Sequence, residues 1–141
     1  MKHQLAALLL SFLAYAPLQA APAKVAKAPA AVVDVYYFHG NQRCMSCNKI
    51  EAYTKEAVAQ RFAADVKKGR VVMHVLNLEE DSNLHYAQDF KINAKTVVVT
   101  RSVGGKQESY RTLDQVWVLL NDKAKFQNYV EKNVNAAKKG A

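Results

Sequence analysis

The chain has 141 residues, which leaves room for one domain of ordinary size. Half of the residues are hydrophobic and 23% are charged, a composition that excludes an intrinsically disordered protein. The formal net charge is +8, but the lysines and arginines are scattered and form no basic stripe interleaved with aromatic residues. The sequence therefore predicts no nucleic-acid-binding surface.

The N-terminus has the features of a secretory signal peptide. A short polar start precedes an apolar run over 5–15, and small residues with an A-x-A cleavage site at 21–23 follow it. The run is shorter than the roughly 20 residues that cross a bilayer, so we expect no stable membrane insertion of the mature chain. These features predict a signal peptide over 1–23, a flexible linker over 24–31, and a periplasmic or secreted protein.

The rest of the chain alternates between strand and helix patterns. Residues 32–38 are β-branched and aromatic, which is typical of a central strand that is apolar on both faces. A helix is expected over 44–66, because apolar residues recur there at helical spacing. A second strand over 71–78, a short helix over 84–90 and a third strand over 96–100 are expected next.

A hairpin and a last helix complete the predicted domain. The Gly-Gly pair at 104–105 favours a tight turn, from which 107–110 returns as an antiparallel strand. A capping box that begins at Thr112 predicts the start of the last helix, with Trp117 on its buried face. Residues 135–141 are expected to form a disordered tail.

The expected order of elements is β-α-β-α-β-β-α. The first two connections contain helices, so the first three strands are expected to be parallel, and the hairpin adds an antiparallel edge. The predicted fold class is therefore α/β, with a central four-stranded mixed sheet flanked by helices.

Both cysteines of the chain, Cys44 and Cys47, lie in one Cys-x-x-Cys motif at the expected helix start. The helix N-terminus and the nearby cations Arg43 and Lys49 favour the thiolate of Cys44, which is the form that attacks a disulfide. Cys47 follows one turn later on the same face, where it can resolve a mixed disulfide made by Cys44. The pair is therefore predicted to be a redox-active disulfide that needs no other cofactor, with an inert structural disulfide as an alternative.

Element order and motif position together resemble the thioredoxin-like superfamily. The resemblance covers about residues 32–134, and the segment 90–96 looks like the start of that superfamily's second half. A narrower stretch is similar to exported ArsF-like subunits of nitrophenyl-compound nitroreductases. The residues that carry this narrower resemblance are Tyr36-Tyr37-Phe38-His39-Gly40, Arg43-Cys44, Cys47 and Ile50-Glu51-Ala52. It implies a thioredoxin-like fold, thiol–disulfide chemistry and a role in a nitroaromatic- or arsenical-reducing system.

One departure from the superfamily concerns proline. Thioredoxin-like enzymes usually carry a cis-proline before the third core strand, facing the cysteines. In this chain all prolines precede the predicted domain, and Lys95-Thr96 occupies that place. A cis bond at a non-proline residue is costly, so we expect a trans bond and a different substrate groove. This favours a dedicated partner over general exchange with unfolded proteins.

A second class of function would use the same two thiolates to bind Cu(I). His39 ends the first strand and Met45 lies between the cysteines, and thiolate, thioether and imidazole ligands together suit this soft ion. His39 is also a candidate proton relay for the thiols. The sequence offers no two further ligands nearby for a four-coordinate zinc site.

Several other residues are interpreted as structural. Thioredoxins often bury an acid beneath the second cysteine, but Tyr36 occupies the matching depth of the first strand, and Asp34 is expected nearer the strand entrance. His74 and His85 have no partner pattern, and the acidic turn over 79–81 is expected to be solvated.

The sequence thus predicts an exported thiol–disulfide relay with a periplasmic or membrane-bound partner protein. Cys44 is the attacking thiol and Cys47 the resolving one. The supporting residues are Arg43, His39, Lys95 and Thr96.

Overall fold

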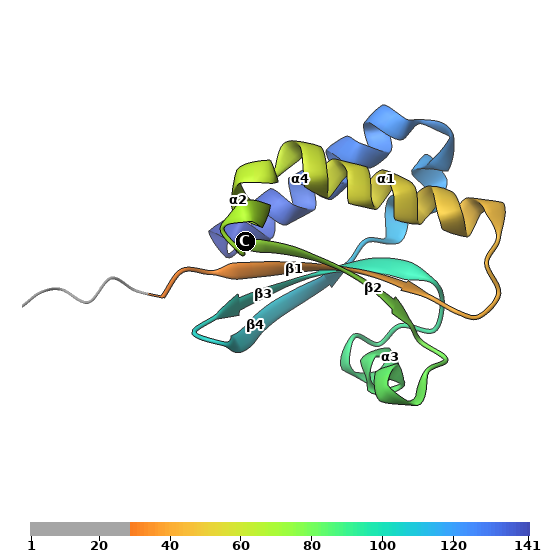
Figure 1. Cartoon of the computed structure of the whole chain (residues 1–141), viewed down its shortest axis with the longest axis horizontal. Coiled ribbons are helices and arrows are strands. Elements are labelled where there is room, and N and C mark those ends of the chain that lie inside the picture. Colours follow the sequence, from red (N-terminus) through yellow and green to blue (C-terminus); the bar gives the residue numbers. More distant parts are fainter. Residues whose placement is uncertain (1–28) are drawn as a thin grey trace, which may run out of the picture.

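The computed structural model describes residues 29–141 (Figure 1). The predicted signal peptide over 1–23 and most of the linker over 24–31 lie outside the described residues, so both stay predictions. Among the helices that are described, none is long and apolar enough to cross a membrane.

A four-stranded mixed sheet with the strand order β2-β1-β3-β4 lies at the centre of the domain (Figure 1). β1 pairs in parallel with β2, while β3 is antiparallel to both β1 and β4. Alternate residues of β1 face opposite sides of the sheet, and most of them are apolar, so the strand suits its central position. The strand bounds are β1 (Val32–His39), β2 (Val71–Asn77), β3 (Thr96–Val103) and β4 (Lys106–Thr112).

The expectation that the first three strands are parallel is wrong, because β3 runs antiparallel to β1. Between β2 and β3 the chain forms only the 3₁₀ turn η1 (Asp81–Asn83) and the short helix α3 (His85–Asp89). β2 ends opposite the end of β1, and Thr96 begins β3 opposite Phe38, so the connection stays at one end of the sheet. A parallel third strand would instead need a crossover along the length of the sheet.

Helices cover the two faces of the sheet unequally. α1 (Met45–Arg61) and α4 (Lys123–Lys139) pack on one face, and α3 lies on the other (Figure 1). The helix expected over 44–66 is divided at the buried Phe62 (φ −125°), after which α2 (Ala63–Lys67) follows. The main core between the sheet and the long helices includes Val33, Val35, Tyr37, Ile50, Val58, Val97, Val99, Phe126 and Val130.

The predicted start of the last helix at Thr112 is also wrong. Thr112 ends β4, and the N–H of Leu113 still donates to Val97 O of β3 (2.8 Å), so the strand pairing continues to this point. α4 begins ten residues later and is capped by Asp122, whose carboxylate accepts the N–H of Lys125 at 3.0 Å. Two 3₁₀ turns fill the interval, η2 (Asp114–Val116) and η3 (Val118–Asn121).

The C-terminal residues 135–139 are helical, whereas the sequence led us to expect a disordered tail over 135–141. Arg101 of β3 donates to the carbonyl oxygens of Ala137 and Lys138, both at 3.1 Å. Lys138 also forms an ion pair with Asp65 of α2. These contacts attach the end of α4 to the sheet and to α2, so the domain extends beyond residue 134.

The predicted central mixed sheet flanked by helices is confirmed. A parallel β-α-β unit is followed by an antiparallel hairpin and a final helix, and the hairpin joins the sheet through β3 beside β1. This arrangement is a thioredoxin-like α/β fold.

Candidate active site

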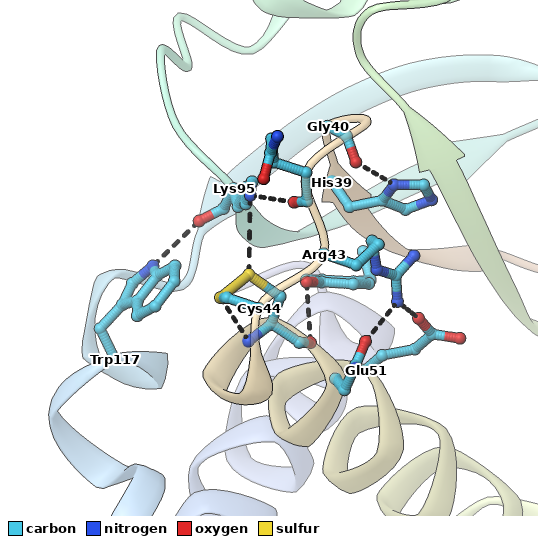
Figure 2. The surroundings of a disulfide bond; sticks show 11 residues. His39, Gly40, Arg43, Cys44, Glu51, Lys95 and Trp117 are labelled. Carbon is cyan, nitrogen blue, oxygen red and sulfur yellow. Dashed lines mark hydrogen bonds and ion pairs between the residues drawn. A yellow bond between two sulfur atoms is a disulfide. The ribbon is translucent and has the colours of Figure 1, made fainter.

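The Cys-x-x-Cys motif lies where the chain leaves β1 and enters α1 (Figure 2). Cys44 is the N-cap residue of α1 and has an extended backbone (φ −104°, ψ 166°). Its Sγ accepts the backbone N–H of Cys47 at 3.1 Å, one of the N–H groups that a helix start leaves unpaired. The two cysteines form a disulfide with their Cα atoms 5.0 Å apart.

The two sulfur-bearing residues differ in their exposure. Cys44 is exposed, whereas Cys47 is completely buried. A thiol or disulfide from another molecule therefore reaches Cys44 first, and Cys47 can react only with its neighbour in the motif. This difference supports the predicted roles of Cys44 as the attacking thiol and Cys47 as the resolving thiol.

The predicted cationic support from Arg43 is weaker than expected. The guanidinium of Arg43 is directed along α1, where it pairs with Glu51 and donates to Asn48 Oδ1 at 3.2 Å (Figure 2). Burial alone would raise the pKa of Glu51, but hydrogen bonds and charges from Lys55 and Arg43 outweigh burial and hold that pKa below its usual value. Glu51 is therefore ionised near neutral pH and offsets the charge of Arg43.

Lys95 is the cation that the structure brings to the sulfurs. Its Nζ lies 3.6 Å from Cys47 Sγ and also donates to the carbonyl oxygen of Gln42 (Figure 2). The described residues contain no cis peptide bond, which confirms the expected trans bond at this position. A charged side chain thus replaces the proline that thioredoxin-like enzymes usually place opposite the motif.

Trp117 belongs to the site, although the sequence placed it in the core. Its side chain is 41% exposed, and its indole N–H donates to the backbone carbonyl of Lys95 at 2.9 Å (Figure 2). The prediction failed because it assumed helical spacing from Thr112, whereas this segment forms two 3₁₀ turns.

Tyr37 is a site residue that the sequence analysis did not single out. It is completely buried under α1, and its hydroxyl donates to the carbonyl oxygen of Cys47 at 2.8 Å. Burial raises the pKa of this phenol, so it remains a donor at neutral pH. Tyr36, which the sequence placed beneath the second cysteine, lies on the opposite face and stacks on His74 (4.6 Å between ring centroids). Successive side chains of a strand point to opposite faces, so the pattern along β1 could have indicated that Tyr36 and Tyr37 lie on different faces.

The remaining predicted residues contribute less to the site. Thr96 is buried at the start of β3. His39 Nδ1 lies 3.0 Å from the Gly40 carbonyl oxygen, and its ring is on the side of the loop away from the disulfide (Figure 2). Met45 is 79% exposed. Residues 29–141 contain no group of three or more His, Cys, Asp or Glu side chains that could hold a metal ion.

Two histidines without a predicted partner each pair with an aspartate. His74 Nε2 contacts Asp34 Oδ1 at 2.7 Å across neighbouring strands, and His85 Nδ1 contacts Asp89 Oδ2 at 2.7 Å within α3. The Asp34 pair joins residues of different strands, so no local pattern could have indicated it.

Two open depressions lie on either side of Lys95. One is bordered by Thr96, Asp114 and Trp117, and the other by His39, Gly40 and Glu79. Neither depression is lined by a cysteine, and Lys95, which contacts Cys47 Sγ, borders both.

Comparison with protein families and with curated proteins finds no match. Among solved structures, the chain is similar to oxidized thioredoxin O2 from Arabidopsis thaliana, with 14% sequence identity and a TM-score of 0.42, over 68% of this chain and 76% of that one. These values are too low to transfer a function, so the fold assignment rests on the strand order and connections described above. The narrower ArsF-like resemblance is not confirmed by these comparisons. The chain therefore has a thioredoxin-like fold with a Cys-x-x-Cys disulfide at the start of α1.

Proposed function

We propose that this chain is an exported thiol–disulfide oxidoreductase that acts as a redox relay for a dedicated periplasmic or membrane-bound partner protein. The observation that carries the proposal is the pairing of an exposed Cys44 with a buried Cys47 at the start of α1. The disulfide between them is the redox group, and the chemistry uses no other cofactor.

The proposed reaction proceeds in two exchange steps. In the reduced protein, the thiolate of Cys44 attacks a disulfide of the partner, forms a mixed disulfide and releases one partner sulfur as thiolate. The thiolate of Cys47 then attacks Sγ of Cys44, which forms the Cys44–Cys47 disulfide and releases the second partner sulfur. Two electrons pass from the dithiol to the partner, and the same steps in reverse oxidise a partner dithiol.

The surroundings of the disulfide support a dedicated partner. Lys95 contacts the buried sulfur from the position that proline usually occupies, and the indole N–H of Trp117 donates to the backbone carbonyl of Lys95. An incoming chain therefore meets a charged side chain and a carbonyl that already accepts a hydrogen bond. From the resemblance over 36–52, we further propose that the partner belongs to a nitroaromatic- or arsenical-reducing system in which this chain is a subunit.

Trapping tests the proposed roles of the two cysteines. Cys47→Ser is expected to accumulate a mixed disulfide between Cys44 and the partner in periplasmic extracts, because the resolving thiol is missing. The matched control Cys44→Ser keeps the buried thiol and is expected to form no such adduct. Equal behaviour of the two variants in trapping, together with unchanged exchange of a small disulfide by both, would refute the proposal.

Copper binding is the alternative that the same variants distinguish. Met45 is an exposed thioether between the two cysteines, and soft sulfur ligands suit Cu(I). A Cu(I) carrier would retain about one ion per reduced chain against a modest chelator and would lose it in either cysteine variant. That result without any trapped partner would favour a carrier over a relay.

A further inference from the structure

We propose that Lys95 is the counter-charge of the Cys47 thiolate, so that the buried resolving cysteine of the reduced protein ionises and attacks readily. The inference rests on the proposed thiol–disulfide function and concerns its second step. It gives a role in this step to Lys95, which lies where thioredoxin-like proteins usually have an uncharged proline.

The buried sulfur needs such a counter-charge. The side chain of Cys47 is completely inaccessible to solvent, and burial disfavours a thiolate. The helix N-terminus acts most strongly on Cys44, the N-cap residue, and less on Cys47 three residues further on, because its effect falls off along the first turn. Lys95 Nζ lies 3.6 Å from Cys47 Sγ, close enough for a charge-assisted N–H···S hydrogen bond once the disulfide opens.

Two further contacts hold Lys95 over the sulfur. Its ammonium donates to the carbonyl oxygen of Gln42 in the loop before the motif, and its backbone carbonyl accepts the indole N–H of Trp117 at 2.9 Å (Figure 2). Lys95 is half-buried, so solvent screens its charge less than that of a free surface lysine. The cation is therefore already in place when Cys47 becomes a thiolate.

The other charged groups around the motif do not replace Lys95. Arg43 is paired with Glu51, whose carboxylate offsets its charge, and its guanidinium lies 5.9 Å from the ring of Tyr37. Tyr37 is a neutral donor to the backbone of Cys47 at neutral pH. Within residues 29–141, Lys95 is the cation in contact with a sulfur of the motif. Other titratable groups near the motif or Lys95 come from β1 and the loop after it, from α1, from the turn after β2 and from η2. They include Tyr37, His39, Arg43, Lys49, Glu51, Glu79 and Asp114.

The ion pair assists the step that closes the disulfide. The thiolate of Cys47 attacks Sγ of Cys44, the bond from Cys44 to the partner sulfur breaks, and the partner leaves as a thiolate that takes its proton from water. Lys95 keeps its proton throughout. Because its charge stabilises the reduced form of the site, the pair is also a stronger oxidant than it would be with a neutral residue at this position.

Titration of Cys47 tests the inference without any partner. In a Cys44→Ser background only one thiol remains, and its ionisation is followed by the ultraviolet absorbance of the thiolate. An opposite charge at this distance shifts a pKa by about one unit or more. At a pH below the thiol pKa, adding Lys95→Met should therefore lower the thiolate fraction about tenfold. Lys106→Met, at the far end of the sheet, removes the same charge and should change nothing.

A second variant separates the charge from the hydrogen bond to Gln42. Lys95→Gln keeps a donor for that carbonyl but has no charge, so it should behave like Lys95→Met, whereas Lys95→Arg should retain most of the effect. With both cysteines present, loss of the charge should slow closure of the mixed disulfide about tenfold near neutral pH and much less at alkaline pH.

The inference is overturned if Lys95→Met and Lys95→Gln titrate like Lys106→Met. It is also overturned if only Lys95→Met has an effect, since the hydrogen bond would then act instead of the charge. Because the titration needs no partner, it can succeed although trapping fails, or fail although trapping succeeds, so the two proposals are tested separately.

Discussion

Tyr37→Phe tests whether the phenol of Tyr37 fixes the second cysteine to the sheet. The substitution removes one hydroxyl and leaves the aromatic ring in the core. That hydroxyl makes a buried hydrogen bond of 2.8 Å to the carbonyl oxygen of Cys47. The perturbation is therefore confined to a single contact between β1 and the first turn of α1.

The expected cost follows from this contact. A neutral hydrogen bond within a protein contributes about 0.5–1.5 kcal/mol net, and losing an oxygen atom leaves a much smaller void than losing a side chain. We expect the free energy of unfolding to fall by about 1 kcal/mol, roughly a fivefold change in the ratio of folded to unfolded protein. Urea titration of the oxidised protein measures this change as a lower midpoint with an unchanged slope.

A matched substitution on the surface provides the control. Tyr110 is 38% exposed on β4, so Tyr110→Phe should change stability by less than about 0.5 kcal/mol. If Tyr37→Phe is no more destabilising than Tyr110→Phe, the hydrogen bond contributes nothing. A loss above about 3 kcal/mol would show that the change disrupts packing, which is also incompatible with a single-contact role.

Two further predictions concern pH. The hydrogen bond from Lys138 lowers the pKa of Asp65, although burial opposes this effect. The ionised carboxylate of Asp65 therefore stabilises the fold above the ordinary Asp pKa, and this stabilisation is lost as pH falls through the lowered pKa. Asp65→Asn should therefore reduce stability at neutral pH and flatten the acid loss in urea midpoints. Burial, then the charge of Asp34, raises the pKa of Tyr36 to about 12, so stability should fall as pH rises from about 10 towards that value. Tyr36→Phe should reduce this alkaline slope, and an unchanged slope would contradict the assignment.

The sequence by itself determined the positions of the strands and of the Cys-x-x-Cys motif. β1 matches its predicted range to within one residue, because a β-branched and aromatic run is a strong local signal. The position of Cys44 at the start of α1 and of Cys47 one turn later also follows from local order along the chain. Local patterns are reliable where neighbours in the sequence decide the structure.

The directions and ends of elements required tertiary structure. β3 is antiparallel because the connection before it stays at one end of the sheet, which depends on its path and not on its composition. The helix expected from Thr112 begins at Lys123, because Thr112 pairs with β3 as the end of β4 and two 3₁₀ turns follow it. Lys138 and the last turn of α4 are ordered by contacts with residues distant in sequence, Asp65 and Arg101.

Some contacts of the site follow from the sequence, and others require the tertiary structure. The disulfide could be predicted because both cysteines lie in one helical turn. The resemblance placed Lys95 opposite the cysteines, although it lies 48 positions from Cys47. No pattern indicated the contacts of Tyr37 and Trp117, because each is made across separate elements, and Trp117 lies 22 positions from Lys95. Residue spacing places the two sulfurs together, but tertiary packing brings Lys95, just before β3, to the buried one.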